Sequence, residues 1–201
     1  MSPLLLLSFL LAGTAAASPS PPPPVPPRWP EQYHAVLVTN QTDRGGRLRQ
    51  IGIYYDWPRG RALNYVRDQL SDDPVVDVQW ANGTSFLFDR ESCETVQYAT
   101  GLQPPDWASR AAYLGRELVD GFECDVWSNF YFVRYDVDVA TGRPVSWVSV
   151  TEAGTRTRRH VLSFEPGAVM SDDSKFQAPA HCFSGRNADA SAFLLGPVSS
   201  V

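Results

Sequence analysis

Short apolar runs separated by turn-forming residues fill the chain from Trp29 onward. In many runs large apolar side chains recur at every second position, which is the period of a β-strand. Connections such as "PRGR", "ANGT" and "ATGR" are too short for crossover helices, so neighbouring strands should pair antiparallel. The pattern predicts strands near residues 33–39, 49–57, 61–67, 74–80, 84–90, 93–99, 120–127, 129–139, 144–151 and 157–165, with a short one around 176.

One stretch favours a helix. Residues 105–118, "PDWASRAAYLGREL", include Asp106, which can cap a helix, and three alanines with high helix propensity. The sequence therefore predicts a helix between two groups of strands.

Large apolar side chains are expected on both faces of several strands. If residues 82–83 (Asn-Gly) form a two-residue turn, Trp80 pairs with Ser85, and Phe86 and Phe88 lie on the face opposite Trp80. In a sheet with one face exposed to solvent, apolar and polar residues would alternate more regularly along each strand. The sheet is therefore either covered on both faces or curved around an apolar cavity, whose candidate lining is Trp57, Trp80, Phe86, Phe88, Phe130 and Phe132.

The segment "YYDWPRGR" combines aromatic and charged residues around a turn. Pro58 presets the turn and Gly60 relaxes it, which places Asp56 near Arg61 across the hairpin. An exposed cross-strand ion pair contributes less than about 1 kcal/mol. The segment is predicted to be a fold-setting hairpin and not an active site.

The ends of the chain differ in composition from the middle. Residues 1–17 have the apolar core and small-residue cleavage site of a secretory signal peptide, and residues 18–28 form a proline-rich linker. A single β-rich domain is expected over 29–183, followed by a disordered tail over 184–201.

Charge and modification motifs fit a secreted protein. The net charge of −5 disfavours nucleic-acid binding, and no later segment is apolar enough to span a membrane. Asn40 and Asn82 begin N-glycosylation sequons. The expected location is extracellular, in a cell wall or apoplast, or the lumen of the secretory pathway.

The familiar catalytic spacings are absent from the sequence, and no cofactor is expected. Asp136 and Asp138 form an Asp-x-Asp pair, which holds a metal in many glycosyltransferases. Here the pair lies on an alternating strand, where solvation or pairing with Arg143 is the favoured interpretation and a metal site the alternative.

Three cysteines in a secreted chain predict either one disulfide and one remaining thiol or an intermolecular bridge. Spacing alone leaves every pairing open. The stretch before Cys182 contains Pro179 and is unsuited to a central strand, so the chain end needs another tether to the sheet.

Several long motifs resemble a group of small secreted plant proteins that carry the label of glycosyl-group transferases. The resemblance covers roughly residues 29–183 and is carried by "WPEQYHAVLV", "YYDWPRGR", "WANGTSFLF", "PPDWASRAAYLGRELVDGFECDVW", "TGRPVSW" and "FEPGAVMSDDSKFQAPAHCF". It implies a glycosyl-transferring or carbohydrate-active enzyme as one alternative.

The ending "SDDSKFQAPAHC" also resembles that of ependymin-related proteins, with Phe176, Pro179 and Cys182 at matching positions. That resemblance implies the architecture of bacterial lipoprotein carriers: a mainly β protein whose curved antiparallel sheets form a half-open barrel around an apolar pocket, with one or two short helices. It also implies a Cys93–Cys182 disulfide and a free, buried Cys124. The competing pairings are Cys93–Cys124 and Cys124–Cys182.

Together these patterns predict a secreted glycoprotein that binds a lipid or another hydrophobic small molecule, with no catalysis implied. The alternatives are the enzyme named above and a cell-wall structural or adhesion protein, with cell-wall polymers as further partners. The oligomeric state stays open, a homodimer included.

Overall fold

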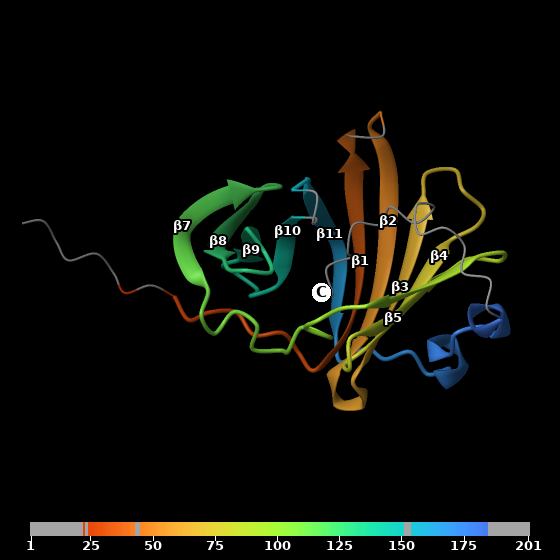
Figure 1. The fold of residues 1–201 in the computed structure, drawn as a ribbon. Helices are drawn as coiled ribbons and strands as arrows, with labels where there is room; N and C mark the ends of the chain where they lie inside the picture. Colours follow the sequence, from red (N-terminus) through yellow and green to blue (C-terminus); the bar gives the residue numbers. More distant parts are fainter. Residues whose placement is uncertain (1–21, 23, 43–44, 151–153, 185–201) are drawn as a thin grey trace, which may run out of the picture.

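Eleven strands form one antiparallel sheet in the computed structural model, which describes residues 22, 24–42, 45–150 and 154–184 (Figure 1). The predicted signal peptide and all of the predicted tail beyond Ser184 lie outside the described residues. The strands are β1 (Gln32–Gln41), β2 (Arg47–Asp56), β3 (Arg61–Asp68), β4 (Val75–Trp80), β5 (Thr84–Phe88), β6 (Cys93–Gln97), β7 (Ala112–Val119), β8 (Phe122–Ser128), β9 (Arg134–Asp138), β10 (Pro144–Val150) and β11 (Arg156–Pro166). Three short 3-10 helices are described, η2 (Trp57–Arg59), η3 (Asp173–Phe176) and η4 (Ala180–Phe183).

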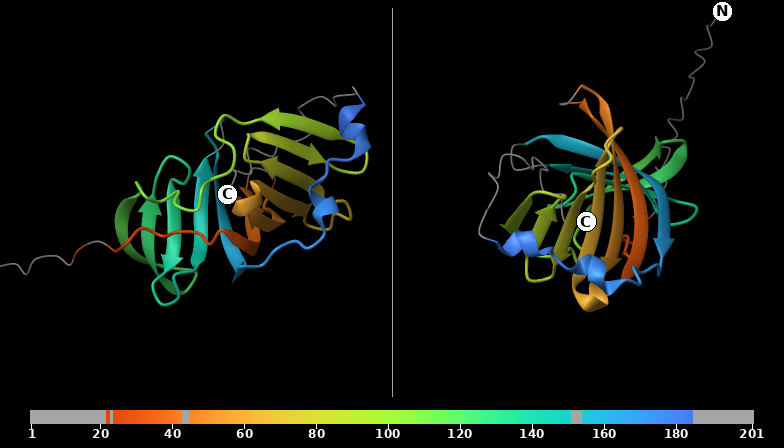
Figure 2. Two further views of the ribbon diagram at one scale, coloured as in Figure 1. Left: turned by 90° about the horizontal axis from the view of Figure 1, so that it is seen from below. Right: turned by 90° about the vertical axis from the view of Figure 1, so that its right-hand side faces the viewer.

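The sheet consists of two meanders joined at its centre. The strand order is β6-β5-β4-β3-β2-β1-β11-β10-β9-β8-β7, so β1 pairs with both β2 and β11. The sheet curves strongly but does not close, and β6 and β7 form its two edges (Figure 2). The predicted fold class, a mainly β half-open barrel with few short helices, is confirmed.

Alternation along the strands gives the sheet an apolar inner face. In β1, Tyr33, Ala35 and Leu37 are at most 1% exposed. Their partners on β2 are apolar and equally buried, because directly paired residues of antiparallel strands point to the same face. Those partners are Tyr55, Ile53 and Ile51.

A second apolar cluster covers the outer face of β3 and β4. Leu63, Val78 and Phe176 form its buried centre, and Phe176 comes from η3 in the C-terminal segment. That segment lies along the outer face (Figure 2, blue). Both faces of this half of the sheet are therefore covered, which is one of the two arrangements that the apolar residues on both strand faces left open.

The hairpin between β2 and β3 fixes the C-terminal segment in place. The Arg61 Nε atom lies 3.1 Å from Asp56 Oδ2, and its Nη2 atom lies 2.6 Å from Asp173 Oδ1. The guanidinium also lies 3.8 Å from the centroid of the Phe176 ring. The predicted proximity of Asp56 and Arg61 is confirmed, but both side chains are buried, so the estimate for an exposed pair does not apply.

The predicted helix over 105–118 is wrong. Residues 105–110 form turns, and residues 112–118 belong to strand β7, which pairs with β8. Gly115 has φ of 112°, and the register of β7 shifts between Tyr113 and Gly115. A right-handed helix cannot hold that backbone conformation, so pairing with β8 overrides the helix propensity of the alanines.

Two further strand predictions are corrected. Gln79 pairs with Ser85, which shifts the predicted β4–β5 register by one residue. The turn has three residues and ends at Gly83, whose φ is 88°. In this register Phe86 and Phe88 share the outer face with Trp80. The short strand predicted around Phe176 is helix η3, whose first turn is capped by a carboxylate of the preceding segment.

The disulfide joins Cys93 of β6 to Cys182 of η4, as predicted. Cys124 is free and buried. The bridge ties the end of the described chain to one edge of the sheet. In the part of the chain that the structure describes, no helix has the length and apolar character needed to cross a membrane.

Candidate functional site

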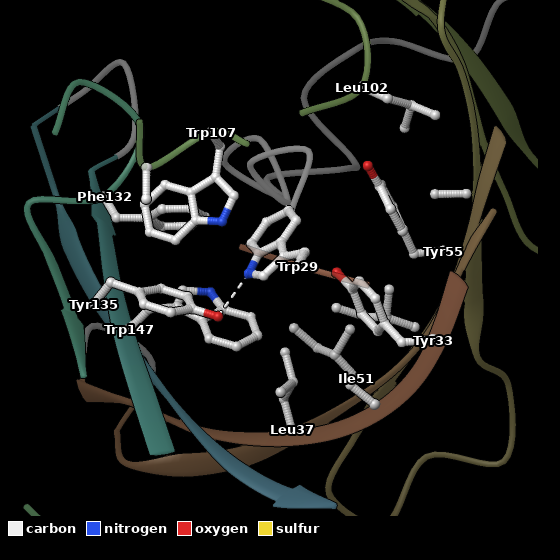
Figure 3. Close-up of a cluster of buried hydrophobic side chains, with 14 of the residues drawn as sticks. Trp29, Tyr33, Leu37, Ile51, Tyr55, Leu102, Trp107, Phe132, Tyr135 and Trp147 are labelled. Atoms are coloured by element: carbon white, nitrogen blue, oxygen red, sulfur yellow. Dashed lines mark hydrogen bonds between the residues drawn. The ribbon is translucent and has the colours of Figure 1, made fainter. Parts of the chain in front are cut away.

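Aromatic rings fill the hollow of the curved sheet (Figure 3). Trp29, which precedes β1, lies at the centre, with its ring centroid 5.3–6.2 Å from those of five other rings. Its Nε1 atom donates a hydrogen bond of 2.6 Å to Tyr135 Oη, and its backbone N–H donates to the Pro105 carbonyl. Trp107, from the segment between β6 and β7, packs beside it. Two segments outside the sheet therefore plug the interior with the chain's own side chains.

The six aromatic residues predicted to line one pocket lie in different places. Phe132 is fully buried in the interior cluster, and Trp57 packs partly buried against it. Phe130 is 91% exposed. Its position follows from a turn in which Asn129 Oδ1 accepts hydrogen bonds from the backbone N–H groups of Tyr131 and Phe132.

The other three members of that set lie on the outer face. Trp80 and Phe88 pack against the cluster centred on Phe176, and Phe86 contacts the Phe183 ring with centroids 5.7 Å apart. The structure therefore does not bring the six residues together into one pocket.

A cavity of about 520 Å³ lies where the N-terminal segment meets the β9–β10 turn and the end of β11. Aromatic rings and prolines form much of its wall. Its lining residues are Pro27, Arg28, Trp29, Pro30, Tyr135, Val137, Thr141, Gly142, Arg143, Pro144, Phe164 and Pro166. None of the six predicted pocket residues lines this cavity, which is named here the end cavity.

The end cavity depends on the path of the N-terminal segment, which crosses the sheet beside β8–β10 (Figure 2). Pro27 and Arg28, assigned by the sequence to a linker, form part of its wall. Burial raises the pKa of the Tyr135 phenol far above its usual range, so this group stays neutral. The alternation of apolar and polar residues identifies strands only. It could not predict this part of the cavity wall, because the N-terminal segment forms the wall without pairing with a strand.

Asp136 and Asp138 are both held by donors of the protein itself. Asp136 is fully buried and lies 2.7 Å from Arg134 Nε and 3.0 Å from Arg158 Nη1. Asp138 accepts hydrogen bonds from the backbone N–H and the hydroxyl of Thr141. Arg143, the partner expected from the sequence, lines the end cavity instead. Among the described residues, no group of three or more metal-ligating acidic, histidine or cysteine side chains is found.

A buried polar cluster lies on the inner face of β3–β5. Asp77, 2% exposed, accepts hydrogen bonds from Asn64 Nδ2 (3.1 Å), Gln79 Nε2 (2.6 Å) and the Ser85 hydroxyl. Burial raises the pKa of Asp77 to about 6, although these three donors act in the opposite direction. The carboxyl group was missed by sequence reasoning, since the one-residue error in the β4–β5 register placed it beside Phe86 and Phe88.

The raised pKa of Asp77 predicts a specific pH dependence of stability. A carboxyl group with a folded-state pKa of about 6 and an unfolded value of 3.8 stabilises the folded state most below pH 3.8. That contribution is lost as the pH rises through 6, by about 3 kcal/mol in total. Asp77→Asn should remove the dependence, so the difference in unfolding free energy between the variant and the parent should change in the variant's favour from pH 4 to pH 7.

Urea titrations at a series of pH values measure this difference. Asp72→Asn, at an exposed position, is the matched control and should follow the parent at every pH. Parallel curves for the parent and Asp77→Asn would contradict the assignment of a raised pKa to this carboxyl group.

The two sequon asparagines are exposed. Asn40 lies near the end of β1, and Asn82 lies in the β4–β5 turn, where its side-chain oxygen accepts a hydrogen bond from the Thr84 N–H. Their side chains therefore face solvent at two separate places on the molecule.

One solved structure with low sequence identity shares the fold, and two others show a weaker likeness. A crystal structure described as an uncharacterized conserved protein from Thermus thermophilus is similar with a TM-score of 0.51 and 10% identity, over 75% of this chain and 87% of that one. MucB is similar with a TM-score of 0.40 and 17% identity, over 76% and 58%. MucB in complex with MucA(peri) gives 0.31 and 16%, over 75% and 55%. The first likeness concerns the fold alone, and none of the three assigns a role to a residue of this chain.

Sequence comparison adds the family. No curated protein matches the chain. The model of the family described as "Domain of unknown function (DUF8395)" matches residues 28–182, from the wall of the end cavity to the disulfide-bonded Cys182. The chain therefore belongs to the DUF8395 family.

Proposed function

We propose that the protein binds a hydrophobic small molecule, such as the alkyl chain of a lipid, in the end cavity. The observation that carries this proposal is a cavity of about 520 Å³ walled by Trp29, Tyr135, Phe164 and several prolines. Small-molecule sites are typically concave, largely apolar and of about 300–1,000 Å³. Because the chain's own aromatic side chains fill the centre of the half-barrel, the end cavity is the ligand site that we propose.

The setting that we propose is extracellular or secretory. A disulfide is consistent with an oxidising compartment, and the exposed Asn40 and Asn82 would be accessible for glycosylation there. The protein would then act as a glycoprotein that carries or sequesters its ligand.

The alternative functions have less support. A metal-dependent glycosyl transfer at Asp136 and Asp138 would require both carboxylates to leave their present donors, including two arginines. A structural or adhesive role in a cell wall rests on the proline-rich segment, part of which lies outside the described residues.

A series of neutral alkanols tests the proposal. Octanol, decanol and dodecanol should each bind saturably in a calorimetric titration. Affinity should rise about fourfold for each added methylene until the cavity is full, because each buried methylene contributes about 0.8 kcal/mol. Native mass spectrometry of the protein purified without detergent, followed by lipid extraction, should identify a bound hydrophobic molecule.

Filling the cavity provides the control. Val137→Phe places a larger side chain in the lining and should lower decanol affinity at least about tenfold. Val139→Phe adds the same ring two residues away, outside the lining, and should leave the affinity within about twofold. The absence of saturable alkanol binding to the parent protein would overturn the proposed function.

A further inference from the structure

We infer that the ligand of the end cavity is an anionic amphiphile, whose head group is bound by Arg28 and Arg143 and whose alkyl chain lies against the aromatic wall. This inference rests on the proposed function and adds the chemical class of the ligand. It follows from the charge of the lining, from the absence of ion-pair partners for the two arginines among the described residues and from the way that their backbones are held.

The described residues that line the end cavity carry two positive charges and no negative one. Its charged members are Arg28 and Arg143, and neither aspartate nor glutamate is among the lining residues. The whole chain has a net charge of −5, so the cavity differs in sign from the protein around it. A local positive field in an apolar cavity attracts anions and disfavours cationic ligands.

Among the residues that the structure describes, no acidic side chain pairs with either arginine. In the described part of the chain, neither Arg28 nor Arg143 has a carboxylate oxygen within 4.0 Å. Asp138, the closest aspartate to Arg143 in the sequence, is engaged by Thr141. Both guanidinium groups therefore keep their donors for a ligand.

The backbones of both arginines are held in place. Arg28 directly precedes Trp29, whose side chain is buried and bonded to Tyr135 and whose N–H is bonded to the Pro105 carbonyl. Arg143 follows the β9–β10 turn, and its carbonyl accepts a 2.9 Å hydrogen bond from the Asp138 N–H. The two side chains thus start from fixed points on different walls, one on the N-terminal segment and one in the connection between β9 and β10.

Guanidinium groups suit carboxylate and phosphate head groups because their planar donors form paired, charge-assisted hydrogen bonds. The apolar wall beside them suits an alkyl chain. A ligand with both parts satisfies the whole lining, whereas a neutral lipid leaves two arginines without a partner. The head group is therefore a carboxylate or a phosphate, and the experiment below separates these two.

The test compares ligands that share one alkyl chain and differ in head group. Decanoate, decyl phosphate, decanol and decyltrimethylammonium are titrated calorimetrically into the full-length mature protein at low ionic strength. Each anion should bind at least about tenfold more tightly than decanol, and the cation more weakly than decanol. The tighter of the two anions identifies the head-group chemistry. The advantage of the anions should shrink as salt is added.

Variants then assign the preference to the two arginines. In Arg28→Gln/Arg143→Gln the anions and decanol should bind with affinities within about twofold of one another. Arg67→Gln, at an exposed position of β3 far along the sheet, should retain the full preference. Equal binding of anions and decanol to the parent, or a preference that survives the double substitution, would overturn this inference and leave the proposed function standing. If no decyl ligand binds, the proposed function itself fails.

Discussion

Replacement of Trp29 by alanine should lower the free energy of unfolding by about 3 to 5 kcal/mol, the range for loss of a large buried aromatic side chain. Trp29 is 4% exposed and contacts five other rings, yet it lies outside every strand. Its removal leaves a void at the centre of the half-barrel that backbone pairing cannot close. It also removes the donor to the buried Tyr135 hydroxyl.

Urea denaturation followed by far-UV circular dichroism measures this effect without depending on tryptophan emission. Trp29→Phe keeps most of the packing and loses the indole N–H. It should therefore lower the free energy of unfolding less than the alanine substitution does. Phe130→Ala, at a side chain that is 91% exposed, should change stability by at most about 0.5 kcal/mol. A loss of less than about 1 kcal/mol for Trp29→Ala would show that the plug is not needed for the fold.

Removal of the disulfide with Cys93→Ser/Cys182→Ser should lower the free energy of unfolding by about 4 to 5 kcal/mol in the chain-entropy model. The two residues are 89 positions apart, so the bond constrains a long loop of the unfolded chain. In the folded state it holds η4 against the edge strand β6. The C-terminal segment retains its contacts through Phe176 and Arg61, so the loss should appear in global stability and not as a change of fold.

Cys124→Ala is the matched control, because it removes a buried thiol without touching the bridge. It should cost about 1 kcal/mol, as expected for a small deletion in a core. Alkylation of the native protein followed by non-reducing peptide mapping should label neither Cys93 nor Cys182. A double serine variant as stable as the parent would mean that the bridge adds nothing to the folded domain.

The sequence specified the strands better than the connections between them. Periodic apolar side chains located all strands except β7, because burial on one face forces the alternation. The predicted β4–β5 register was wrong by one residue. Asn-Gly suggested a two-residue turn, whereas the turn has three residues and ends at Gly83. Strand β7 was not predicted because the alanines in and before it favour a helix. Its conformation is instead determined by Gly115 and by pairing with β8.

The candidate site could not be predicted from the sequence, for a different reason. Two-residue periodicity finds faces of strands, but the end cavity is enclosed by a proline-rich segment that joins no strand ladder. From the sequence, Arg28 was assigned to a linker, and Arg143 was expected to pair with Asp136 or Asp138. Only the three-dimensional path of the N-terminal segment brings these two arginines to one cavity. The Cys93–Cys182 pairing, by contrast, was predicted through a family resemblance and is confirmed.

The central position of β1 has a consequence for synthesis of the chain. Strands β1 to β6 follow one another in sequence, so this meander can form as soon as it leaves the ribosome. The other edge of β1 can pair only after β11 has been synthesised, and the hydrogen bond of Trp29 can form only after Tyr135 has been synthesised. Until then the middle of the future sheet is an unpaired strand edge, open to other chains or to chaperones. The pairing of β1 with β11 is therefore a long-range closure, which we expect to be slow compared with the pairing of strands that are neighbours in sequence.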